Sequence, residues 1–132
     1  MPVPPSNPFD YAVVRVVPRV EREEFLNAGV IVFCLTQNFL AAKVAVADES
    51  LLALWPELDL EDVNRRLQAI PLVCRGGKEA GPIGALSQRE RFQWLVSPRS
   101  TIIQVSPVHT GLCDTPEMQL EHLFTALVSR PK

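Results

Sequence analysis

Short apolar runs separated by turn residues fill the first third of the chain, whereas later apolar residues recur every three or four positions. Residues 11–17 are rich in β-branched side chains and stop at a proline, as a strand does. Two further apolar runs, 30–35 and 39–47, are joined by a tight polar turn at 36–38. Alternate apolar positions in the third run predict an antiparallel sheet with a face backed by helices.

The N-terminus has a different character from the rest of the chain. The first ten residues contain four prolines, which remove amide donors and fix an extended backbone. We therefore expect residues 1–10 to form a proline-rich arm rather than a strand or helix. Residues 11–130 contain no repeat, low-complexity tract or long linker, so they are expected to form a single domain.

A charged segment connects the first two predicted strands. Residues 21–27 favour one or two helical turns, which would end near Asn27. Gly29 follows where a left-handed helix cap needs a residue without a Cβ, and it would open the second strand.

Two helices are expected after the third strand. One spans residues 48–55, and Asp59 caps the next, which Pro71 kinks or ends. The apolar stripe of this second helix comprises Leu60, Val63, Leu67 and Ile70. Most glycines lie in residues 75–84, which predict a mobile surface loop without the strand and Gly-Lys-Ser/Thr signature of a phosphate-binding loop.

The last third of the chain predicts two more helices and a fourth strand. Ser87 and Glu90 have the spacing of a helix capping box, and residues 101–105 have strand composition. Asp114 or Thr115 caps the final helix, whose apolar stripe comprises Leu120, Leu123, Phe124, Leu127 and Val128. The pattern as a whole predicts a single α+β domain: a mainly antiparallel sheet of about four strands, helices between strands three and four, and a C-terminal helix packed on the sheet.

Composition and charge narrow the function classes. Lys and Arg number 13 against 15 Asp and Glu, so no basic surplus supports extended nucleic-acid binding. No apolar run approaches the roughly 18 residues of a membrane span, and no signal peptide is evident, so we expect a cytoplasmic protein without membrane contact. The three cysteines form no C-x-x-C pair and are expected to be buried thiols. His109 and Cys113 alone complete no metal site, and we predict neither a metal nor a cofactor.

Several polar residues lie where predicted strands and turns meet, which is where sites often form. Seven were selected: Arg15, Glu24, Asn27, Arg99, Gln104, His109 and Asp114. In a shared pocket, Arg15 and Arg99 would hold an anion and His109 would transfer a proton. Glu24 or Asp114 would orient the histidine, with Asn27 and Gln104 as polar support.

Each of these residues also has a purely structural explanation. Arg15 and Glu24 are suited to form an ion pair between strand and helix. Asp114 is a good helix N-cap, and Arg99 is placed to satisfy free carbonyls in its turn. His109 lies in a turn-forming segment where it can bond to the backbone.

Four sequence blocks carry a resemblance to a known family. They are Tyr11-x-x-Val-Arg-Val-Val-Pro18, Glu24-Phe-x-Asn-Ala-Gly-Val30, Ser97-Pro-Arg-Ser-Thr-x-x-Gln104, and Ser106-Pro-Val-His-Thr-Gly111 with Asp114 and Leu120-Glu-x-Leu-Phe124. In these blocks the chain resembles the small bacterial proteins of domain of unknown function 3037 (DUF3037), which have no established activity. Their genes often lie beside one for a HipA-like kinase, and the resemblance therefore implies such a kinase as a protein partner.

Two functions remain open at this stage, and whether the protein is an enzyme is undecided. One is a noncatalytic accessory protein that binds a partner through an exposed apolar patch, for which Phe9, Trp55 and Trp94 are candidates. The other is a small enzyme or ligand-binding domain that acts on an anionic phosphoester or nucleotide through the shared pocket. The sequence indicates no oligomeric state.

Overall fold

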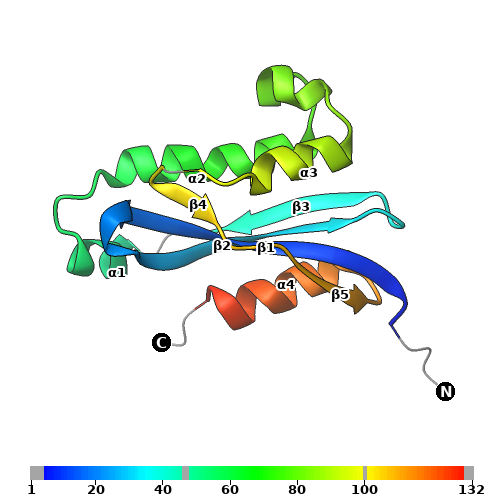
Figure 1. The fold of residues 1–132 in the computed structure, drawn as a ribbon, viewed down its shortest axis with the longest axis horizontal. Helices are drawn as coiled ribbons and strands as arrows, with labels where there is room; N and C mark the ends of the chain where they lie inside the picture. The colour runs from blue at the N-terminus through cyan, green and yellow to red at the C-terminus, as the bar shows by residue number, and fades with distance from the viewer. Residues whose placement is uncertain (1–4, 46–47, 100, 130–132) are drawn as a thin grey trace.

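A computed structural model of the chain describes residues 5–45, 48–99 and 101–129, and Figure 1 shows a sheet between two helical layers. Helices α2 (Leu60–Arg75) and α3 (Gln88–Val96) lie over one face, and α4 (Pro116–Leu127) lies over the other. Helix α1 (Asp48–Leu54) precedes α2, and α1, α2 and α3 all fall between the third and fourth strands in sequence. The structure therefore confirms the expected α+β fold with a C-terminal helix on the sheet.

Among the described residues the sheet has five antiparallel strands, one more than the pattern predicts. The central strand β1 (Asn7–Arg19) pairs with β2 (Glu24–Cys34), which in turn pairs with β3 (Phe39–Val44). On its other side β1 pairs with two short strands placed end to end. The first is β4 (Ile103–Val105), and the second is β5 (His109–Cys113).

Strand β5 was not predicted, because its own sequence reads as a turn. Gly111 lies in it opposite Phe9 of β1, and a Cβ at Gly111 would come within 2.9 Å of the Phe9 ring. The glycine thus serves close packing rather than a turn. The hydrogen bonds that make this segment a strand come from β1, about 100 positions earlier in the chain, so local propensity does not reveal them.

Two expectations near the N-terminus were wrong. Strand β1 begins at Asn7, so residues 7–10 of the expected arm belong to the sheet, and residues 1–4 lie outside the described part of the chain. Residues 24–27 of the expected helix lie in β2, and only a 3-10 turn at Val20–Arg22 precedes them. Glu23, with φ of 55°, makes the left-handed turn expected near Gly29. Pairing along β1 supplies more hydrogen bonds than a short isolated helix, which overrides the helical propensity.

The helix signals were more reliable than the predicted helix ends. The Asp59 side chain accepts a hydrogen bond from the Asp62 amide at 3.1 Å, and Ser87 and Glu90 form the expected capping box. Helix α2 continues past Pro71 to Arg75, and the expected loop contains a 3-10 segment, η2 (Lys78–Ala85). Strand β3 ends at Val44 rather than at residue 47, and residues 46–47 lie outside the described ranges.

Alternation along β1 divides the core into two clusters. On the α2 and α3 side the larger cluster includes Val14, Val16, Ile31, Leu67 and Phe92. On the α4 side the smaller cluster includes Phe9, Val30, Val32, Leu120 and Leu123. Even-numbered residues of β1 therefore face α2 and α3, and odd-numbered residues face α4.

One buried arginine fixes the C-terminal end of α2. The Arg91 guanidinium donates hydrogen bonds to the carbonyls of Val73, Cys74 and Leu86 at 2.9, 2.6 and 3.1 Å. Gly76 follows α2 with φ of 74°, and a Cβ there would meet Arg91 Nη1 at 2.7 Å. The arginine satisfies carbonyls that a helix end leaves without intrahelical partners, and the glycine makes room for it.

Candidate functional site

The sheet places three of the seven candidate residues side by side. Arg15 on β1 pairs with Asn27 on β2 and with Gln104 on β4. Directly opposite residues of antiparallel strands project from the same face. Asn27 Nδ2 donates to the Leu127 carbonyl at the end of α4 at 3.0 Å, so this row faces the α4 side. The Gln104 amide donates to the Thr101 carbonyl at 3.0 Å and so stabilises its own turn.

Arg15 is the unusual member of this row. Its Cζ lies 4.2 Å from the ring centroid of Phe25, a partly exposed residue next to Asn27 along the same face of β2. Arg15 Nε and Asn27 Oδ1 are both buried, and neither has a hydrogen-bond partner among the described residues. An adjacent donor and acceptor without partners can together bind a water molecule or a polar group from a ligand.

Glu24 lies on the opposite face from Arg15. Neighbouring residues of a strand project to opposite sides, and Phe25 stacks with Arg15, so Glu24 points toward α1 and α2. There it forms an ion pair with Arg22 and lines a cavity of about 610 Å³ that Trp55 also borders. The expected ion pair between Arg15 and Glu24 is therefore absent from the described residues.

Arg99 completes the end of α3. Its Nη2 donates to the Trp94 carbonyl at 2.6 Å, its Nη1 donates to the Leu95 carbonyl at 3.4 Å, and its Cζ lies 4.3 Å from the Trp94 ring centroid. Arg99 therefore has the carbonyl-binding role proposed as its structural explanation. Because α3 covers the opposite face of the sheet from α4, Arg99 is remote from the row that contains Arg15.

His109 and Asp114 lie at the two ends of the β5 region. The exposed His109 ring has its centroid 5.2 Å from that of Tyr11, an odd-numbered residue of β1 on the α4 side. The Asp114 carbonyl accepts a hydrogen bond from Asn7 Nδ2 at 2.8 Å, and Thr115, not Asp114, is the N-cap residue of α4. Arg99 and His109 thus lie on opposite sides of the sheet, and the seven residues do not form one shared pocket.

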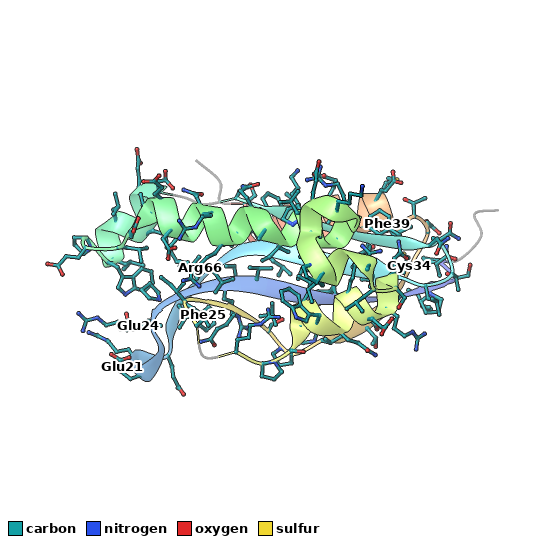
Figure 2. All side chains as sticks on the ribbon, turned by 90° about the horizontal axis from the view of Figure 1, so that it is seen from above. Glu21, Glu24, Phe25, Cys34, Phe39 and Arg66 are labelled. Atoms are coloured by element: carbon teal, nitrogen blue, oxygen red, sulfur yellow. The ribbon has the colours of Figure 1, made fainter. Side chains whose placement is uncertain are left out.

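A groove between α2, α3 and β4 is the surface feature that the sequence did not reveal. It encloses about 260 Å³, and Figure 2 shows it from above, between α2 with the labelled Arg66 and the segment that leads into β4. Its apolar base comprises Ile70, Val73, Leu95, Ile103 and Val105, and its rim carries Arg66, Trp94 and Arg99. The exposed tryptophan next to a turn arginine was the only available sequence signal.

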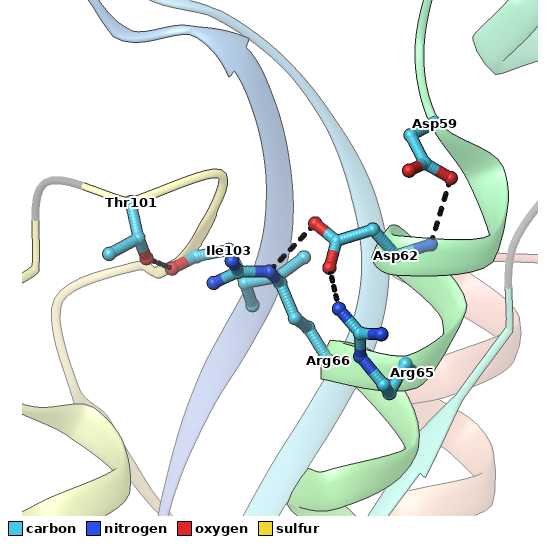
Figure 3. A network of polar contacts seen from close by, with 6 residues as sticks. All are labelled: Asp59, Asp62, Arg65, Arg66, Thr101 and Ile103. Atoms are coloured by element: carbon cyan, nitrogen blue, oxygen red, sulfur yellow. Dashed lines mark hydrogen bonds and ion pairs between the residues drawn. The ribbon is translucent and has the colours of Figure 1, made fainter.

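The charge of this groove is set by its two arginines. Arg66 Nε donates to Asp62 Oδ2 at 2.9 Å, and its two Nη groups make no hydrogen bond to the described residues. Figure 3 shows Arg66 extending from α2 toward the turn with Thr101 and Ile103. Arg66 lowers the pKa of the Asp62 carboxyl through that hydrogen bond. No Asp or Glu side chain lies among the described residues that line the groove itself.

The thiols match the sequence expectation. Cys34, Cys74 and Cys113 are all free and buried. Burial raises the pKa of the Cys74 thiol to about 12, and burial also raises the pKa of Cys113. Thiols with raised pKa values are poor nucleophiles at neutral pH, so the structure gives no support for cysteine catalysis.

Comparison with known proteins identifies a family without naming an activity. A family model described as protein of unknown function (DUF3037) matches residues 11–128. No curated protein matches the chain, and no solved structure matches it. Over the described residues, no helix is both long and apolar enough to cross a membrane.

Proposed function

Because the chain belongs to the DUF3037 family, whose members have no known activity, we propose from its surface that it is a noncatalytic accessory protein. In this proposal it binds a HipA-like kinase in the cytoplasm and positions or modulates it. The kinase is suggested by the gene neighbourhood that the family resemblance implies.

The observation that carries the proposal is the exposed aromatic residue at the groove. Trp94 is 40% exposed, carries the stacked Arg99 guanidinium, and borders an apolar depression. Tryptophan and arginine are the residue types that most often dominate the binding energy of protein interfaces. Of the other aromatic candidates for such a patch, Phe9 is buried and Trp55 is partly buried against the core, so neither contributes comparably.

The alternative, an enzyme or ligand-binding domain for an anionic substrate, has less support. Its shared pocket required Arg15, Arg99 and His109 to converge, and they are divided between the two faces of the sheet. General acid–base chemistry needs the acid or base within hydrogen-bond reach of the group that holds the substrate. The remaining Arg15 row has no nucleophile or titrating base beside it among the described residues.

Direct binding tests this proposal. The kinase encoded beside the gene in the native host is purified and titrated with this protein in a calorimeter. Binding is expected for the wild type, and Trp94→Ala is expected to weaken it at least about tenfold, because truncating a central interface tryptophan typically has that effect. Leu112→Ala serves as the matched control, since Leu112 is 59% exposed on β5, away from the groove.

Two results would contradict the accessory function. One is no binding of the wild-type protein to the kinase at micromolar concentrations. The other is an equal loss of affinity in Trp94→Ala and Leu112→Ala, which would mean that the groove is not the interface. Circular dichroism confirms that both variants are folded.

A further inference from the structure

Strand β4 has an edge that faces away from the rest of the sheet. The Val17 amide donates to the Ile102 carbonyl at 2.7 Å, and the Ser106 amide donates to the Val13 carbonyl at 2.8 Å. Hydrogen-bonded pairs alternate along an antiparallel ladder, so residue 104 also directs its amide toward β1. The N–H groups of Ile103 and Val105 consequently point away from β1.

These outward backbone groups border the groove. Ile103 and Val105 belong to its lining, and both are only partly buried. The Ile103 carbonyl accepts a hydrogen bond from Thr101 Oγ1 at 2.7 Å, so the open positions are the two N–H groups and the Val105 carbonyl. An edge with open donors and an acceptor is a template for one more strand.

The side chains of the groove define what such a strand would carry. Its base is aliphatic, and its rim has two guanidinium groups with no carboxylate in the lining. Side chains at positions i and i+2 of an extended segment lie on the same face. A segment with an aliphatic residue and an acidic residue two positions apart would therefore fill the base and face Arg66 or Arg99 at once.

We propose that the groove binds an extended acidic and aliphatic segment of a protein partner, which adds to the sheet as a strand along β4. This inference deepens the accessory function and rests on it for the identity of the partner. The outward amides give the segment its register, and the cationic rim gives it its preference for acidic residues.

A synthetic peptide tests the groove without the kinase. The probe is an acetylated and amidated octapeptide, Thr-Val-Thr-Glu-Thr-Val-Thr-Glu, in which one face alternates valine and glutamate. Its control has lysine in place of both glutamates. The full-length protein is titrated with each peptide and followed by amide chemical shifts. The glutamate peptide is expected to bind at least about tenfold more tightly than the lysine peptide, with shifts concentrated at β4.

Two substitutions separate strand addition from other binding modes. Val105→Pro removes an outward N–H that β1 does not use, and proline is tolerated at such edge positions. It is expected to weaken both peptide and kinase binding at least about tenfold, whereas Val105→Thr, which keeps the amide, is expected to bind like the wild type. Arg66→Glu is expected to reverse the peptide preference in favour of lysine.

The outcomes distinguish this inference from the accessory function. If the glutamate peptide binds as expected but the kinase does not bind, the accessory function fails and the groove assignment stands. If the kinase binds folded Val105→Pro as tightly as the wild type, strand addition is overturned and the accessory function stands. If Val105→Pro does not fold, Arg66→Glu decides, because an unchanged peptide preference overturns the assignment. Self-association of the wild type that Val105→Pro abolishes would identify a second copy as the occupant and overturn the partner assignment.

Discussion

Arg91 on the α2 and α3 side of the sheet and Arg15 on the α4 side are both removed from full solvent contact, but their surroundings differ. Arg91 donates to three backbone carbonyls and closes the end of a helix. Arg15 stacks on Phe25, has a buried Nε without a partner, and forms no ion pair within the described residues. The same residue type thus completes the structure on one side and remains available for binding on the other.

The two faces differ in packing as well. The cluster under α2 and α3 contains most of the buried apolar residues, whereas the cluster under α4 is smaller. A face that is well packed and has its polar groups satisfied contributes most of the stability, because both lost contacts and unpaired polar groups cost free energy. We therefore expect substitutions on the two faces to differ systematically.

The largest effect is expected from truncating a leucine under α2. Leu67 is fully buried, and Leu67→Ala is expected to lower the free energy of unfolding by about 3 kcal/mol through lost burial and the cavity left behind. Leu123 is 9% exposed on α4, and Leu123→Ala is expected to cost about 2 kcal/mol because solvent reaches its site. Urea unfolding of both variants measures the difference. A greater loss in Leu123→Ala would reverse the ranking of the two faces.

A smaller effect is expected from removing the Arg91 guanidinium. Arg91→Met keeps much of the side-chain volume but leaves the buried Val73 and Cys74 carbonyls without these donors, which is expected to cost about 2 kcal/mol. Arg89→Met is the control, because Arg89 is exposed on the same helix, and its effect is expected to stay within about 0.5 kcal/mol. If the two variants unfold at the same urea concentration, the role assigned to Arg91 is wrong.

Local sequence signals predicted the features that depend on neighbouring residues. The capping box of Ser87 and Glu90, the Asp59 cap and the apolar stripe of α2 all involve residues within one or two helical turns. Strand β5 and the strand conformation of residues 24–27 depend on pairing with β1. Their own composition favours a turn and a helix, so the sequence alone gave the wrong element at both places.

The candidate site was harder to predict than the fold, because it depends on register. An irregularity between Val14 and Arg15 brings Asn27, rather than Ala28, opposite Arg15. A shift of one residue would send Asn27 to the other face. Sequence reasoning selected Arg15, Asn27 and Gln104 correctly as neighbours, but it added Glu24 and Arg99, which strand alternation and helix capping place elsewhere.

The smallest effect on stability is expected at Arg15, where it would sharpen the comparison with Arg91 most directly. Arg15→Met removes a guanidinium that makes no hydrogen bond to the described residues and keeps an apolar side chain next to Phe25. The free energy of unfolding is expected to change by less than about 0.5 kcal/mol, since a buried donor without a partner contributes nothing when it is present. A loss of about 2 kcal/mol, as expected for Arg91→Met, would instead mean that Arg15 is a structural arginine. A near-zero change would indicate that folding does not require this guanidinium, and that its position on the open face must be explained by what it binds.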